Sequence, residues 1–258
     1  MLLKLIACKI ITREASHLIA RSDNTIDATF LRKGFHNEPD NLKRAIQDEI
    51  DRVESGQDIH TNDTGVSNED FAAILIGYGL CSNGISGLHS SKYPLVIPKA
   101  HDCITFFLGS RHRYKHYFNA HSGTYWYSQS WTENTSLKNK DCLDNLRKQY
   151  EEKGYDEDAI DYLLECESSW IKNYNNAAFI RVPEVLPHSG DTACRDAVRN
   201  TAEQFGWNYE ELEGDISLLR DFIDGNWREE DFVIIHPGEA VAPSFDENII
   251  KTVPIGND

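Results

Sequence analysis

The sequence has no long hydrophobic run and comparatively few basic residues. No stretch of its 258 residues approaches 18 consecutive apolar residues, so we expect no segment to cross a membrane. Lysine and arginine number 26 against 42 aspartates and glutamates, which gives a formal net charge of −16 at pH 7. A surface this acidic repels phosphate backbones, so nucleic acid is excluded as an expected partner. The composition predicts a soluble, cytoplasmic protein. We expect its substrate to be a small molecule.

The first residues lack the marks of an export signal. Residues 2–10 are mostly apolar, but no basic lead precedes them and no small-residue cleavage site follows. We interpret them as a first strand and expect the six cysteines to remain reduced in the cytosol. No two of these cysteines form a CxxC pair, so their roles depend on where the fold places them.

Short apolar runs alternate with segments of helical periodicity. This pattern is typical of a parallel sheet with helices on both faces, because strands buried on both sides are continuously apolar. We predict one Rossmann-like α/β domain over residues 1–258, with a subdivision into two similar halves left open near residue 130. The expected strands are 2–10, 71–78, 93–98, 177–182 and 231–236. The expected helices are 39–53, 141–153, 156–172, 192–205 and 214–222, and another begins at residue 104.

Three cysteines lie at the ends of the first three predicted strands: Cys8, Cys81 and Cys103. Ligands of open parallel sheets bind beyond the carboxyl ends of the strands. Neighbouring strands lie about 5 Å apart, so three thiolates could share one metal ion or iron–sulfur cluster. The alternative is that each is a small buried hydrophobe, as free cysteine often is. The other three are expected to pack on helices: Cys142, Cys166 and Cys194.

His101 and Asp102 directly precede Cys103. Histidine titrates near neutral pH, which suits proton transfer, and a carboxylate can orient it. We therefore predict catalytic roles for both residues. For His101 the alternatives are a metal ligand or a satisfied polar residue, and for Asp102 they are a helix N-cap or a partner of a metal ligand.

The turn around Cys81 is rich in glycine. Gly79, Asn83 and Gly84 could bind a cofactor through backbone amides, and the alternative is a mere tight turn between strand and helix. The turn lacks the Gly-Lys-Ser/Thr of a P-loop and the spacing of the dinucleotide fingerprint.

Two further places are predicted to contribute to cofactor binding. Tyr125 and Trp126 belong to an aromatic segment that could line a pocket for a flat or cationic ligand, or could form a core or dimer contact. His236 ends the last predicted strand, so we expect it at the same sheet edge as the cysteines.

Several of these segments resemble the family of unknown function numbered 1638. The similar stretches are 5–8, 77–84, 94–104, 108–110 and 123–126, with thinner similarity over 206–209 and 231–238. The chain departs from the family pattern at Lys9, where an acidic residue is usual, and at Ser82, where glycine is usual. The resemblance implies an association with corrinoid-dependent methyl transfer and one-carbon metabolism.

Three functions follow from these observations. The first is an enzyme whose cysteines hold a zinc ion that activates a thiol for methyl transfer, with a corrinoid protein as partner. The second is an enzyme with a [4Fe-4S] cluster whose open iron acts as a Lewis acid, similar to quinolinate synthase in its single, dispersed cysteines. The third is a non-enzymatic accessory protein that binds a metal or cofactor for a partner. A brown colour after anaerobic purification separates a cluster from zinc.

Overall fold

The structure is a computed structural model that describes residues 1–32, 38–57, 71–135, 137, 139–186 and 192–256. The chain divides into two compact units. Unit 1 comprises residues 1–114 and 215–258, and unit 2 comprises residues 115–214. Unit 2 is therefore one continuous segment, whereas unit 1 is completed by the last part of the chain.

Unit 1 is built on a five-stranded sheet of order β2-β1-β3-β4-β8. Its strands are β1 (Leu2–Cys8), β2 (Thr25–Leu31), β3 (Ala73–Gly77), β4 (Leu95–Pro98) and β8 (Phe232–Ile235). The first four run parallel, and β8 pairs antiparallel with β4. β3 and β4 are buried along their whole length, which is why they are continuously apolar in the sequence. The predicted α/β fold with a mostly parallel sheet is confirmed.

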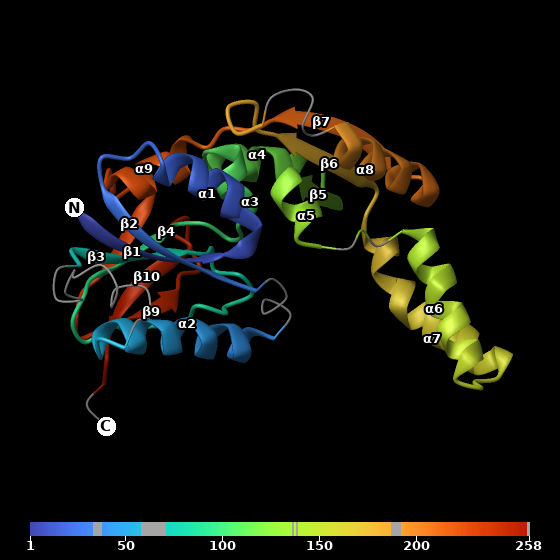
Figure 1. Ribbon diagram of the computed structural model, residues 1–258, viewed down its shortest axis with the longest axis horizontal. Coiled ribbons are helices and arrows are strands. Elements are labelled where there is room, and N and C mark those ends of the chain that lie inside the picture. Colours follow the sequence, from blue (N-terminus) through green and yellow to red (C-terminus); the bar gives the residue numbers. More distant parts are fainter. Residues whose placement is uncertain (33–37, 58–70, 136, 138, 187–191, 257–258) are drawn as a thin grey trace. The chain divides into compact units, whose positions relative to one another are not determined.

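Both faces of this sheet are covered. In Figure 1, α1 (Thr12–Ile19), α3 (Ile104–Leu108) and α9 (Ser217–Asp224) lie on one side, and α2 (Pro39–Glu54) lies on the other with the antiparallel pair β9 (Glu239–Pro243) and β10 (Ile250–Pro254). A 3-10 turn, η1 (Lys9–Ile11), joins β1 to α1. α2 buries Leu42, Ile46, Ile50 and Val53. Their spacing of three or four residues puts them on the helix face that packs against the sheet.

Unit 2 holds a parallel three-stranded sheet of order β5-β6-β7. The strands are β5 (Thr124–Ser128), β6 (Asn176–Arg181) and β7 (Asn208–Glu213). The helices are α5 (Gln129–Glu133), α6 (Lys140–Glu152), α7 (Glu157–Ser168), the 3-10 helix η4 (Ser169–Asn173) and α8 (Thr192–Phe205). α4 (Arg111–Ala120) begins in unit 1 and ends in unit 2. Within the described ranges, no helix is both long and apolar enough to span a membrane.

The carboxyl ends of β1, β3 and β4 are neighbours at one edge of the unit 1 sheet. β1 pairs with β3 as far as Ala7 and Gly77, and β3 pairs with β4. A Cβ atom at Gly77 would lie only 2.6 Å from the Cβ of Ala7. Glycine therefore allows β1 and β3 to approach closely just before both strands end.

Candidate functional site

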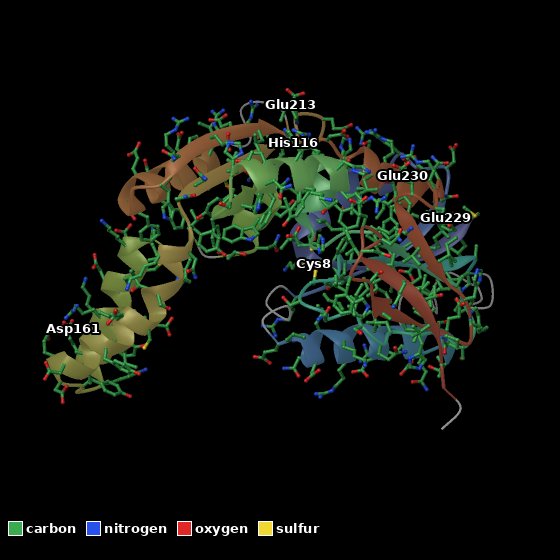
Figure 2. The ribbon with its side chains drawn as sticks, turned by 180° about the vertical axis from the view of Figure 1, so that it is seen from behind. Cys8, His116, Asp161, Glu213, Glu229 and Glu230 are labelled. Carbon is green, nitrogen blue, oxygen red and sulfur yellow. The ribbon has the colours of Figure 1, made fainter. Side chains whose placement is uncertain are left out.

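Three cysteines gather at this carboxyl edge. Cys8 is the last residue of β1 (Figure 2), Cys81 lies in the loop after β3, and Cys103 lies in the turn between β4 and α3. All three are free thiols, and their exposed fractions are 5%, 9% and 7%. The strand ends thus carry buried sulfur atoms from three distant parts of the sequence.

The thiol of Cys103 contacts both of the other thiols. A hydrogen bond with Cys8 lowers the pKa of Cys103, but a hydrogen bond with Cys81, burial, and the negative charges of Cys81 and Asp102 raise that pKa well above its ordinary value. We call Cys8, Cys81 and Cys103 the thiol cluster.

Backbone hydrogen bonds hold the loop after β3 against the turn after β4, and this brings the cysteines of the cluster together. The backbone N–H of Leu80 donates to the carbonyl oxygen of Ala100 at 2.8 Å, and the N–H of Cys81 donates to that of His101 at 2.9 Å. A Cβ atom at Gly79 would lie 2.7 Å from the backbone nitrogen of Asp102. Gly79 is therefore needed for the close approach of the two loops, which places Cys81 beside Cys103.

The backbone at Cys81 is strained. Cys81, Ser82 and Asn83 have φ angles of +46°, +57° and +66°, and the turn is closed by a 3.0 Å hydrogen bond from the N–H of Gly84 to the carbonyl of Cys81. A left-handed conformation costs roughly 1–2 kcal/mol for most residues other than glycine, and asparagine adopts it more readily. Such strain is concentrated at functional sites in many proteins.

The predicted cofactor-binding residues Asn83 and Gly84 have different surroundings. The side chain of Asn83 is exposed, whereas Gly84 is buried. A Cβ atom at Gly84 would lie 2.6 Å from Cδ2 of Leu42 on α2. Gly84 thus has a packing role, and its contact with a cofactor stays a prediction.

Tyr78 is a member of the site that the sequence analysis missed. It directly follows β3, is 3% exposed, and its hydroxyl has no hydrogen-bond partner among the described residues. Burial raises the pKa of Tyr78 far above its usual value, and the negative charges of Cys8, Cys103 and Cys81 raise it further. The hydroxyl therefore lies near all three thiols and stays protonated. The signal that was lacking is strand register: Gly77 pairs with Ala7 and so places Tyr78 level with Cys8, which the sequence alone does not show.

Asp102 makes two hydrogen bonds within the fold. Its Oδ1 accepts from the backbone N–H of Ile104 at 2.9 Å, and its Oδ2 accepts from the hydroxyl of Tyr114 at 2.8 Å. Burial raises the pKa of Asp102, although these hydrogen bonds act to lower it. The neighbouring His101 is exposed. The N-cap position of α3 is occupied by Cys103, so Asp102 supports the first turn of the helix from one residue earlier, through its bond from Ile104. The catalytic roles of His101 and Asp102 stay predictions.

The three sulfur atoms of the thiol cluster are suitable ligands for a metal ion that prefers sulfur. In the part of the chain that the structure describes, no group of three or more His, Cys, Asp or Glu side chains is arranged to hold a metal ion. Cys103 interacts with both Cys8 and Cys81, and metal binding releases the protons of the thiols that become ligands. Three sulfur ligands are nonetheless the kind that zinc and iron–sulfur clusters take, and they leave one position for a further ligand.

Tyr125 and Trp126 lie on β5 in unit 2, not in the unit that contains the thiol cluster. The Tyr125 ring lies within 6.0 Å, centroid to centroid, of five other rings: Tyr127, Trp131, Trp170, Tyr174 and Trp207. Burial raises the pKa of Tyr125 to about 12. Trp126 packs on Tyr117 with a centroid distance of 4.7 Å. These contacts fit the core alternative, and a cofactor pocket here stays a prediction.

The expectation that His236 shares an edge with the cysteines is wrong. β8 runs antiparallel to β4, and Ile235 pairs with Leu95 at the start of β4. His236 therefore lies at the opposite edge of the sheet, where its backbone N–H donates to Glu239 at 2.9 Å. The error arose because an apolar run does not encode strand direction.

The cysteines outside the cluster are less buried than expected. Cys142 and Cys166 are exposed and Cys194 is half-buried, so simple packing is wrong for the first two. The Cys142 thiol donates to the carbonyl of Leu137 at 3.0 Å. All three belong to unit 2, so unit 1 contains no fourth cysteine.

Comparisons with known proteins identify the family but no activity. The family model described as "Protein of unknown function (DUF1638)" matches residues 30–223, a range that includes Cys81 and Cys103 and begins after Cys8. Neither the curated proteins nor the solved structures gave a match. Because the matched range covers most of the chain, the protein belongs to the DUF1638 family.

Proposed function

We propose that the thiol cluster is the metal centre of a zinc-dependent enzyme that transfers a methyl group to a thiol substrate. The observation that supports this most is that Cys103 contacts both Cys8 and Cys81, although the three come from separate strand ends. A cysteine that only fills space in a core needs no sulfur neighbour. Three buried sulfurs at one point are typical of shared ligands.

The strained turn supports a ligand role for Cys81. A turn that served packing alone could use an unstrained backbone, yet Cys81 and Ser82 adopt left-handed conformations. Hydrogen bonds to the carbonyls of Ala100 and His101 hold this turn against the turn of Cys103. A cysteine whose backbone is fixed in this way loses less conformational entropy when its sulfur atom binds a metal ion.

The remaining position of the centre is where the substrate thiol is proposed to bind. Zinc supplies a Lewis acid that lowers the pKa of the thiol. We propose that His101, which is exposed and lies two residues before Cys103, carries the thiol proton to solvent. In the transfer a sulfur–carbon bond forms and the bond from the methyl group to its donor breaks, with the electron pair left on the donor. We propose a corrinoid protein as that donor.

The metal content of cysteine variants tests the centre. Cys8→Ser, Cys81→Ser and Cys103→Ser should each lose most of the zinc found in anaerobically purified wild-type protein, as measured by elemental analysis. Cys142→Ser and Cys166→Ser are matched controls from unit 2 and should keep it. Full zinc content in all three cluster variants would contradict the proposal, as would a wild-type protein that binds no zinc.

The methyl-transfer step has a separate assay. Zinc-loaded protein is mixed anaerobically with methylcobalamin and 2-mercaptoethanol, and the methyl thioether is measured with the loss of the cobalt–carbon bond. We expect turnover that depends on the cluster cysteines. A zinc-loaded protein without turnover would favour the accessory, non-enzymatic function.

A [4Fe-4S] enzyme is the second candidate. It is favoured by the absence of a fourth cysteine from unit 1, since three thiolates leave one iron open to substrate. Brown, iron-containing protein after anaerobic purification would establish this candidate in place of zinc.

A further inference from the structure

Tyr78 carries a buried hydroxyl for which neither the fold nor the proposed metal centre supplies a role. The residue is 3% exposed, and its hydroxyl has no partner among the described residues, with sulfur atoms counted as possible partners. An unpaired buried hydroxyl destabilises a fold, because it loses its hydrogen bonds to water without replacement. Phenylalanine would fill the same space without this cost.

The surroundings of the hydroxyl indicate what it can bind. The register of β1 and β3 pairs Gly77 with Ala7 and so places Tyr78 level with Cys8, beside the thiol cluster. Burial, the largest cause of the raised pKa of Tyr78, keeps the hydroxyl protonated, so that it is a donor, and burial also disfavours an anionic acceptor, which would lose its hydration there. A neutral oxygen atom next to the cluster is therefore the partner that it suits best.

We propose that Tyr78 is a specificity-determining residue that donates a hydrogen bond to a neutral oxygen of the substrate. This assigns the substrate class as a thiol that carries a hydroxyl or carbonyl oxygen near its sulfur. The inference rests on the proposed function, since it needs a substrate at the thiol cluster. It adds a contact by which the site distinguishes one thiol from another.

The test compares two thiols of nearly equal shape. 2-Mercaptoethanol has a hydroxyl where 1-propanethiol has a methyl group. Each is titrated into the full-length protein loaded with Co²⁺, whose absorption reports thiol binding. The preference for 2-mercaptoethanol over 1-propanethiol should be about threefold to tenfold larger in the wild type than in Tyr78→Phe, the range for one hydrogen bond.

Two controls accompany this comparison. Tyr93→Phe removes the hydroxyl of another tyrosine of unit 1, 4% exposed and located before β4 rather than after β3, and should leave the preference unchanged. Metal-free Tyr78→Phe should be at least as stable in urea as the wild type, since the hydroxyl that it loses has no partner. Reduced stability of this variant would show that the hydroxyl serves the fold and would overturn the inference.

The remaining outcomes separate the inference from the proposed function. Equal preferences in the wild type and Tyr78→Phe, with cobalt bound normally, would overturn the role of Tyr78 alone. An altered cobalt spectrum in Tyr78→Phe before thiol is added would also overturn it, because the hydroxyl would then act on a cysteine ligand. Failure of the wild type to bind cobalt would overturn the metal centre and the inference together.

Discussion

At the residue scale, the hydrogen bonds of Asp102 give this residue a structural role that does not depend on catalysis. It accepts from Ile104 at the start of α3 and from the hydroxyl of Tyr114. Asp102→Ala should therefore lower the free energy of unfolding by about 1–2 kcal/mol, as the loss of a cap does, and leave metal content unchanged. Urea denaturation and elemental analysis measure the two effects. Tyr114→Phe removes only one of the bonds and should cost about 1 kcal/mol. A stable but inactive Asp102→Ala protein would instead establish a catalytic role.

Ser82 gives a second prediction at this scale. Its φ of +57° is unfavourable for serine, and glycine adopts such a conformation without a steric penalty. Ser82→Gly should raise the free energy of unfolding by about 1 kcal/mol. Ser86 lies in the same loop without a positive φ, so Ser86→Gly should not stabilise the protein. A Ser82→Gly variant that is less stable than the wild type would show that the serine side chain makes a needed contact.

The cysteines of the site could be predicted from the sequence, whereas Tyr78 could not. Cys8, Cys81 and Cys103 are found because each follows an apolar run, and strand ends of a parallel sheet meet at one edge. Tyr78 also follows such a run, but a tyrosine there is indistinguishable from a core residue. Only the structure shows that its hydroxyl is unpaired and near the thiols.

At the scale of elements, Glu54 joins the end of α2 to the loop before β4. Its carboxylate accepts from the backbone N–H and the hydroxyl of Ser91, both at 2.7 Å, and from the hydroxyl of Ser90. Burial acts to raise the pKa of Glu54, but these hydrogen bonds outweigh it and lower the pKa below the usual 4.5.

This contact predicts a pH dependence of stability. Because the pKa of Glu54 is lower in the folded state, its carboxylate stabilises the fold at pH values above about 4.5, and this stabilisation is lost as the pH falls through the folded pKa. Glu54→Gln should cost about 1 kcal/mol at pH 7 and progressively less at acidic pH. Urea denaturation at several pH values measures the difference. Glu49→Gln, at a surface pair with Arg52 on the same helix, should change stability little. A Glu54→Gln cost that does not change with pH would contradict this account.

Polarity explains why the sequence analysis found some elements and missed two of the strands, β2 and β7. β3, β4 and α2 stand out because they are apolar runs or have clear helical spacing. β2 and β7 were missed, since their sequences, TIDATFL and NYEELE, contain polar or charged residues and their strands are only partly buried. Both are edge strands, which need fewer apolar residues than central ones. A polar strand at the edge of a sheet is therefore not recognised in the sequence. Even for the apolar β8, the sequence does not show whether the strand runs parallel or antiparallel to its neighbour.

At the scale of the whole molecule, the two units carry different spectroscopic probes. Four of the five tryptophans belong to unit 2, and the fifth, Trp227, belongs to unit 1. The thiol cluster lies in unit 1. In a Trp227→Phe protein that also has serine at positions 142, 166 and 194, fluorescence reports only unit 2 and thiol labelling reports only unit 1.

The variant with these four substitutions allows a test of whether zinc stabilises unit 1 alone. Compact units with separate cores can unfold independently, so urea should produce one transition in fluorescence and another in pulse labelling with Ellman's reagent. The proposed zinc centre requires the folded thiol cluster, so zinc at about 100 times its dissociation constant should stabilise unit 1 by about 2.7 kcal/mol. The fluorescence transition should not move, because all three cysteines of the cluster belong to unit 1. If zinc shifts both transitions by the same amount, the units unfold as one cooperative body. If zinc shifts neither transition while the thiols remain reduced, the thiol cluster is not a zinc centre.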